Sequence, residues 1–269
     1  MKKWFAIAIL IVLAPLAWAA GKLIRDPSVP DVLIAGSATL TPICLTYFPE
    51  DANTLSHVCW DGALDDDTFV GWSMIGAVPQ SPSYGGPIPG SAGPFDAGDY
   101  YTAGALTLEQ HADQSACVLV SITSPDTTQA IVNIDNTTDA TDGHANFNLS
   151  IKSTQASATI WQDGTHTTSQ LAGTATVGRH LLCFAYHYLA SGSSVLRVAL
   201  DNTQTVTSTA VGPPQTTSGG VPFLIGRRMP NVSPQPWLGS VYEEEFWSRA
   251  LSSTDLTSIY NTLHAAGVI

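Results

Sequence analysis

The chain has 269 residues, of which only 12% are charged, and Asp and Glu outnumber Lys and Arg by 22 to 10. A formal net charge of −12 leaves no basic surface of the kind that nucleic acids require, so we expect no nucleic-acid partner. The length suits one large domain with a short extension and is ample to bury a core. Abundant Thr, Ser, Gly and Pro favour strands and turns over helices.

The first 19 residues have the three parts of a secretory signal peptide. Two lysines at positions 2 and 3 give a positive start, an apolar stretch follows, and Ala17-Trp18-Ala19 matches the small-x-small cleavage pattern. We therefore expect a secreted or cell-surface protein. The alternative is a membrane anchor with an uncleaved leader, because the apolar run is at the short limit for a span.

An extended N-terminal arm is expected over residues 20–56, which show little periodicity. Within it, 31–34 and 43–47 are candidates for added edge strands. Residues 79–94 are rich in Pro, Gly and Ser, which predicts a loop inside one domain and not a linker between two.

From residue 95 onward, strand signals recur about every 8–12 residues, the spacing typical of a sandwich or jelly roll. Apolar and polar residues alternate over 145–152, which predicts a strand with one wet face. The stretch 181–189 is almost continuously apolar, as in a strand covered on both faces. Further strands are predicted at 158–161, 195–200, 203–209, 223–225 and 241–247.

One amphipathic helix is predicted near the end of the chain. Ser252 followed by Asp255 is an N-terminal capping signature, and Gly267 suits the end of a helix. Four apolar residues between them form a single stripe: Leu256, Ile259, Tyr260 and Leu263. The expected fold class is therefore all-β, with many strands followed by one short helix.

The segment 239–252 resembles the closing motif of laminin G-like domains in the concanavalin A-like lectin/glucanase superfamily. It has a glycine, a strand with acidic residues, an aromatic pair and then Arg-Ala-Leu-Ser before the helix. Residues 223–226, 195–202, 95–100 and 61–78 resemble earlier segments of that family. Arg179 stands where the family often has Trp.

This resemblance implies a jelly-roll β-sandwich of two antiparallel sheets, concanavalin A-like, over residues 57–269. Members of the family bind glycans, proteins or calcium, or serve as structural modules, so the fold does not fix one function. The shared motifs consist of turn and core residues, and the resemblance therefore supplies no catalytic residue.

Three consecutive acids are the candidates for catalysis: Glu243, Glu244 and Glu245. Glucanases of the same superfold use closely spaced acids on one strand, and the two-residue period of a strand puts Glu243 and Glu245 on one face. Their Glu-x-Asp-x-Glu pattern is absent here. We therefore expect no enzyme and place the acids on a solvated edge or turn.

Calcium is the one cofactor that the sequence suggests. Asp135, Asp139 and Asp142 lie in a turn-rich loop, and hard oxygen ligands on such a loop suit Ca²⁺. Asp65, Asp66 and Asp67 form a second acidic cluster. Solvated turns are the alternative for both.

Four aromatic residues in or beside loops are candidate ligand-binding platforms: Trp72, Tyr84, Trp161 and Trp237. Aromatic faces stack on sugar rings and anchor protein interfaces. Core packing is the alternative for each of them, because strands carry aromatic residues readily.

The four cysteines, Cys44, Cys59, Cys117 and Cys183, permit disulfides behind a secretory leader. Cys44 with Cys59 would close a short loop. Cys117 and Cys183 lie in strand-like runs and either bridge adjacent strands or stay as buried thiols.

Together these features predict a secreted, non-catalytic module that binds a glycan or a surface protein, as in cell adhesion, with calcium assistance. One alternative is a structural subunit of a surface or virion assembly, in which residues 20–56 self-associate by strand addition. The other is a glycoside hydrolase of the same superfold.

Overall fold

A computed structural model describes residues 46–60, 64–66, 72–75, 77–81, 88–95, 99–106, 113–135, 145–163, 166–189, 194–209, 221–227 and 235–269. The predicted leader and the first part of the predicted arm lie outside these residues. In the described part of the chain, no helix combines the length and hydropathy needed to cross a bilayer.

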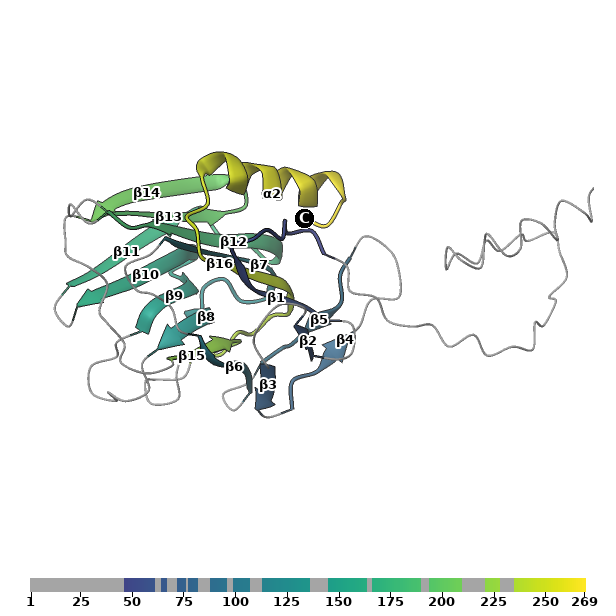
Figure 1. The fold of residues 1–269 in the computed structure, drawn as a ribbon. Helices are drawn as coiled ribbons and strands as arrows, with labels where there is room; N and C mark the ends of the chain where they lie inside the picture. Colours follow the sequence, from purple (N-terminus) through teal and green to yellow (C-terminus); the bar gives the residue numbers. More distant parts are fainter. Residues whose placement is uncertain are drawn as a thin grey trace, which may run out of the picture.

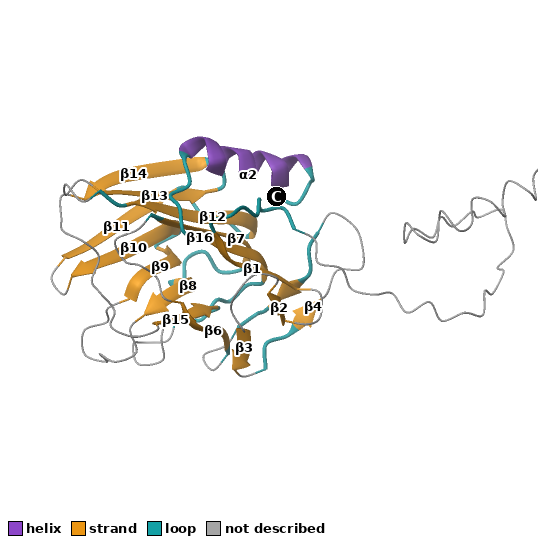
Figure 2. Cartoon of the chain, in the orientation of Figure 1, coloured by secondary structure: helices purple, strands orange, loops and turns teal. Residues whose placement is uncertain are grey.

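The described chain is a sandwich of two antiparallel sheets with one helix packed on the outside, as the resemblance implied (Figures 1 and 2). The strands are β1 (Thr54–Trp60), β2 (Leu64–Asp66), β3 (Trp72–Ile75), β4 (Gln80–Ser81), β5 (Ser91–Ala92), β6 (Tyr100–Leu106), β7 (Gln114–Ile122), β8 (Gln129–Asp135), β9 (Ala145–Lys152), β10 (Gln155–Asp163), β11 (His166–Ala172), β12 (Gly178–His187), β13 (Ser194–Leu200), β14 (Thr203–Thr209), β15 (Val221–Ile225) and β16 (Val241–Trp247).

Sheet A has nine strands, seven of them in the order β14-β13-β12-β7-β16-β1-β2, with β5 paired to β16 and β4 to β5. Sheet B has seven strands in the order β11-β10-β9-β8-β15-β6-β3. Strand β1 begins at Thr54, so the last residues of the predicted arm belong to sheet A. The short strands β4 and β5 lie inside the predicted 79–94 loop.

The main core fills the space between the two sheets. Phe147 of sheet B stacks on Phe246 of sheet A, with ring centroids 5.7 Å apart and an interplanar angle of 2°. Trp60 and Tyr101 make a second contact across the sandwich at 4.7 Å. Burial of these rings, together with the aliphatic side chains around them, helps to hold the sheets together.

A second apolar cluster lies on the outer face of sheet A, beneath helix α2 (Ser253–Ala265) (Figure 1). Leu256, Ile259 and Leu263 of the predicted stripe are buried there, against Trp247 of β16. Ser252 caps the helix, because its side chain accepts from the Asp255 N–H and the Asp255 carboxylate accepts from the Ser252 N–H.

Candidate functional site

The three consecutive acids lie in β16, the strand between β7 and β1 near the middle of sheet A. Glu243, Glu244 and Glu245 are all fully buried. The prediction of a solvated edge or turn is therefore wrong. Its physical reason is the position of the strand, which is flanked on both sides and covered on both faces.

Glu243 is the centre of a buried polar cluster on the outer face of sheet A. Its Oε1 accepts hydrogen bonds from the backbone N–H groups of Tyr47 at 2.8 Å and Phe48 at 2.9 Å. The same oxygen lies 3.1 Å from Nε2 of His57, whose Nδ1 contacts Glu50. The carboxylate thus fixes the segment that precedes β1 onto the sheet.

Glu245 lies on the same face of β16, two residues further along. Its Oε1 accepts a hydrogen bond from the Thr54 hydroxyl at 2.6 Å. Glu244 points to the opposite face, into the sandwich, where its register partners are Val58 and Val118.

The pKa values of this cluster favour protonated groups. Burial lowers the pKa of His57, but the hydrogen bond to Glu243 and the charge of that carboxylate outweigh it and raise the pKa to about 9. Burial raises the pKa of Glu245 to about 7, against the hydrogen bond from Thr54. The imidazole of His57 is therefore protonated near pH 7, where it lies beside Glu243.

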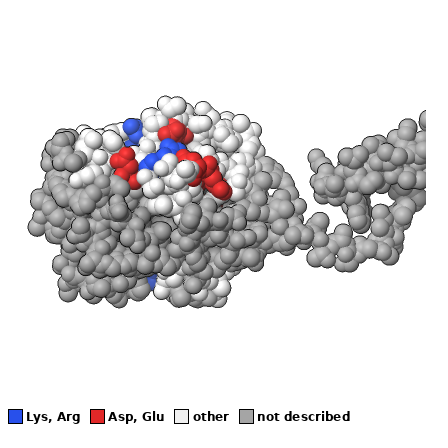
Figure 3. Space-filling model, in the orientation of Figure 1, with Lys and Arg blue, Asp and Glu red and all other residues white. Residues whose placement is uncertain are grey.

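The same segment is also held by surface charges. Arg249 donates from Nε to Asp51 at 2.8 Å and from Nη1 to Asp255 at 3.4 Å, and so joins the segment to the start of α2. Figure 3 shows acidic and basic side chains side by side on this face. Because Glu243 and Glu245 have no access to solvent beneath the segment, a glycosidic bond cannot come within reach of them.

A hydroxyl, an imidazole and a carboxylate also meet at Thr176, His180 and Asp201. His180 Nδ1 contacts Asp201 Oδ2 at 2.8 Å, and Nε2 lies 3.0 Å from the Thr176 carbonyl. The hydrogen bond to Asp201 raises the pKa of His180. The Thr176 carbonyl can only accept, so Nε2 acts as a donor there and not as a base toward the Thr176 hydroxyl.

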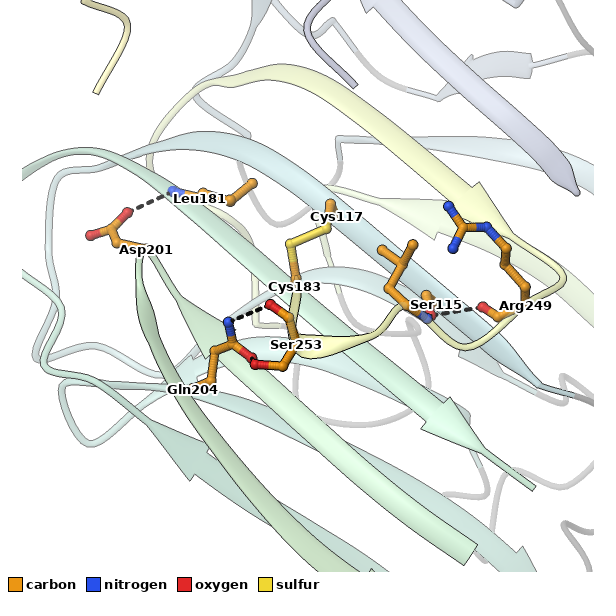
Figure 4. The surroundings of a disulfide bond; sticks show 9 residues. Ser115, Cys117, Leu181, Cys183, Asp201, Gln204, Arg249 and Ser253 are labelled. Atoms are coloured by element: carbon orange, nitrogen blue, oxygen red, sulfur yellow. Dashed lines mark hydrogen bonds between the residues drawn. A yellow bond between two sulfur atoms is a disulfide. The ribbon is translucent and has the colours of Figure 1, made fainter. Parts of the chain in front are cut away.

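The predicted bridge between Cys117 and Cys183 is confirmed, and it joins neighbouring strands β7 and β12 (Figure 4). The two residues are register partners with their Cα atoms 4.1 Å apart. Around them, Asp201 accepts from the Leu181 N–H at 2.9 Å and Gln204 donates to the Ser253 carbonyl at 3.1 Å. Cys59 is also disulfide-bonded; Cys44 lies outside the described residues.

The outer face of sheet B carries four polar side chains in one row across five strands, with Leu224 in the row between two of them. Backbone pairing aligns Thr159 of β10 with Asn148 of β9, Asn133 of β8, Leu224 of β15 and Thr102 of β6. Their sequence neighbours belong to the core, so these residues face outward. We call Thr159, Asn148, Asn133 and Thr102 the polar row.

The amides of Asn133 and Asn148 lie in the middle of the polar row, and the hydroxyls of Thr102 and Thr159 lie at its two ends. Asn148 Nδ2 donates to Asn133 Oδ1 at 3.1 Å. Asn133 is fully buried and its own Nδ2 has no hydrogen-bond partner, whereas Thr102 and Thr159 are half-buried. A buried donor without an acceptor costs free energy until a ligand or water supplies one.

An aromatic residue and a cation lie at one end of the same face. Tyr100 is half-buried on β6, two residues from Thr102, and the guanidinium of Arg227 lies over its ring, 5.0 Å from the centroid. The face therefore combines amides, hydroxyls and a ring, which are the groups that contact neutral polyhydroxylated ligands.

The predicted aromatic platforms do not gather at one place in the described structure. Trp237 is fully buried in the core. Its backbone N–H donates to the Gly226 carbonyl, and its backbone carbonyl accepts from the Phe95 N–H. The structure describes Trp72 and Trp161 only as backbone positions in β3 and β10. Tyr84 lies outside the described residues.

The predicted calcium loop is mostly beyond the described structure. Asp135 is the last residue of β8, while Asp139 and Asp142 lie outside the described residues. Within the described ranges, no three His, Cys, Asp or Glu side chains are grouped to hold a metal ion. Of the second acidic cluster, Asp65 and Asp66 belong to β2.

Residues 95–257 match the family model described as the concanavalin A-like lectin/glucanases superfamily, laminin G type. The chain belongs to this laminin G-like family. No curated protein sequence matches it. The match covers β6 to β16 and the start of α2, and so includes the strands that carry the polar row.

Several solved structures share the laminin G-like fold of this chain at low sequence identity. The receptor-binding domain of botulinum neurotoxin C/D mosaic serotype superposes with a TM-score of 0.58 at 10% identity, over 78% of this chain and 51% of that one. The binding domain of botulinum neurotoxin DC in complex with SialylT superposes with a TM-score of 0.57 at 10% identity, over 79% of this chain and 52% of that one. The same domain in complex with rat synaptotagmin II superposes with a TM-score of 0.57 at 8% identity, over 78% of this chain and 52% of that one. This chain spans about half the length of those structures.

The alternation over 145–152 predicted the strand that carries Asn148. The prediction that this face of the strand is wet is wrong at Asn148 and Ser150, which are buried. Asn133 lies in a mostly apolar stretch, and nothing local shows that it pairs with Asn148. The sequence contains a weak signal for the burial of Glu243, because the acids lie between Val241 on one side and Phe246 and Trp247 on the other, as in an apolar strand.

Proposed function

We propose that this chain is a non-catalytic recognition module that binds a glycan through the outer face of sheet B. The observation that carries the proposal is the polar row, whose ends, Thr102 and Thr159, are half-buried while the two asparagine amides lie buried between them. Sugar hydroxyls both donate and accept hydrogen bonds, so they match a surface of amides and threonine hydroxyls. The half-buried Tyr100 ring beside the row offers an apolar contact for a sugar face.

The location of the acids supports binding without turnover. Retaining and inverting glycosidases need two carboxyl groups on either side of a bound sugar, open to it. Glu243 and Glu245 are instead sealed beneath residues 46–53 and hold backbone N–H and hydroxyl groups. The acids of β16 thus serve the fold, and the half-buried hydroxyls of Thr102 and Thr159 lie on the other sheet.

The comparisons support the same class of role without naming a ligand. Structures with this fold include receptor-binding domains whose complexes contain SialylT or a synaptotagmin. We extend to this chain only the idea of recognition at a surface outside the cell, in line with its predicted leader. Calcium at Asp135, Asp139 and Asp142 remains a prediction that the binding experiment includes.

A glycan array tests the proposal, with the wild-type chain compared with Thr102→Arg and Thr159→Arg. Each substitution places a long charged side chain at a half-buried end of the polar row. We expect wild type to bind at least one neutral glycan and each variant to lose at least about tenfold in affinity, the effect of about 1.4 kcal/mol.

The matched control is Ser258→Arg on the exposed face of α2, which should bind like wild type. Repeating the array with EDTA tests the calcium prediction separately, since only metal-assisted binding would be lost. Equal binding by wild type and both row variants would contradict the assignment of sheet B. Cleavage of a bound glycan would contradict the absence of catalysis.

A further inference from the structure

Strand β14 is the last strand at one edge of sheet A in the described structure. A terminal strand presents unpaired backbone N–H and C=O groups along its open side. Val206, at the middle of β14, is 45% exposed, and Thr203 and Ser208 are exposed as well. The strand pairs with β13 along all seven of its residues, with no shift in register.

β14 lacks the features that keep other edge strands from pairing with a second chain. Proteins protect such edges with charged residues, proline, bulges or very short strands. β14 has no charged residue and no proline, and its register is regular. The strand at the opposite edge of the sheet, β2, is only three residues long and contains two aspartates. Among the described residues, one edge therefore has these protective features and the other lacks them.

The sequence of β14 reads almost the same in both directions, as Thr-Gln-Thr-Val-Thr-Ser-Thr. An antiparallel pairing of two copies about a two-fold axis at Val206 would place like residues opposite each other. Thr203 would face Thr209, and Thr205 would face Thr207. Gln204 would face Ser208, and Val206 would face its own copy. This is the self-complementarity that a two-fold interface requires.

The backbone N–H and C=O groups that this pairing requires point toward the open side of β14. Leu200 and Thr203 flank a two-residue turn and are register partners, so Thr203 is hydrogen-bonded to β13. Alternation along β14 then turns the N–H and C=O groups of Gln204, Val206 and Ser208 toward the open side. In the two-fold pairing, these three residues meet as hydrogen-bonded pairs, and no outward group is left unpaired.

We propose that β14 is an interface between two copies of this chain, which extend sheet A across a two-fold axis at Val206. Charge favours this edge as the site of contact. Two chains with a formal charge of −12 repel one another, and they can approach most closely where both surfaces are neutral. The pairing would also cover the exposed Val206 side chains, which lie side by side on one face of the extended sheet.

The oligomeric state of the purified chain in solution tests this proposal, by sedimentation equilibrium over a range of concentrations. We expect wild type to reach twice the mass of one chain. Val206→Lys places two ammonium groups beside each other at the axis, and Val206→Pro removes an N–H that β13 does not use. Both variants should lose the dimer while keeping the circular dichroism spectrum of the wild type.

Val177→Lys is the matched control, because Val177 is 71% exposed and precedes β12, away from the edge. It should dimerise like wild type. A wild-type chain that stays at the mass of one copy at every concentration would overturn the proposal. So would a dimer that persists unchanged in both Val206 variants, since its interface would then lie elsewhere.

Discussion

Glu243 shows how one buried carboxylate can serve the fold where sequence alone suggests catalysis. It accepts from two backbone N–H groups and lies against a histidine that it keeps protonated. Such an ion pair adds little folding stability compared with an apolar pair of the same shape. Removal of one partner, however, leaves a buried charge without compensation. The cluster therefore makes the attachment of residues 46–53 specific.

Replacement of Glu243 by Ala should lower the free energy of unfolding by about 3–5 kcal/mol. The change leaves His57 buried without its main counter-charge and removes the acceptor for Tyr47 and Phe48. Urea unfolding measures the loss. Glu50→Gln is the control, because Glu50 contacts the same histidine but its side chain is 47% exposed, so the loss should be about 0–1 kcal/mol. Equal losses in the two variants would contradict this role of Glu243.

The stability of the chain should fall as the pH rises from about 4.5 to about 9. Glu245 has a folded pKa of about 7 against an ordinary value of 4.5, so its contribution to stability is complete below pH 4.5 and lost by pH 7. His57 has a folded pKa of about 9 against 6.5, so its contribution is complete below 6.5 and lost by 9.

Melting temperatures at pH 5, 7 and 9 measure this decline. Glu245→Gln should flatten the lower half of the curve, and His57→Gln should flatten the upper half. A wild-type stability that rises from pH 5 to pH 9 would show that other groups dominate.

At the scale of elements, local sequence patterns predicted the helix and most strands from β9 onward, whereas β6, β8 and β11 were not predicted. The capping pair and apolar stripe of α2 and the alternation of β9 depend on residues a few positions apart. The placement of β16 does not, because β1 and β7, which enclose it, are far away in sequence. Three adjacent glutamates read locally as a solvated turn, and only this long-range pairing makes them buried.

The cap of α2 is an element whose contribution can be measured directly. Ser252→Ala removes the acceptor of the Asp255 N–H and should lower the free energy of unfolding by about 1 kcal/mol. Ser258→Ala on the exposed face of the same helix should change it by no more than a few tenths, and in the stabilising direction. Urea unfolding of the two variants compares them, and a Ser252→Ala chain as stable as wild type would mean that packing alone fixes the helix.

At the scale of the whole molecule, the two sheets have different outer surfaces. The outer face of sheet A is closed by α2 and by residues 46–53, which the buried acids hold in place. The outer face of sheet B has no described helix over it and carries the polar row, which is buried at its middle and half-buried at its ends. If two copies join at β14, their sheet B faces lie on the same side of the extended sheet, so a bivalent glycan ligand would gain from avidity.

The most direct test of binding at sheet B is to map the contact by NMR during titration with a glycan found on the array. The side-chain amides of Asn133 and Asn148 give their own signals, separate from the backbone. We expect these signals and the backbone amides of β8, β9 and β15 to shift together and to saturate with the ligand. Shifts confined to α2 and β14, with both asparagine side chains unchanged, would place the binding site elsewhere.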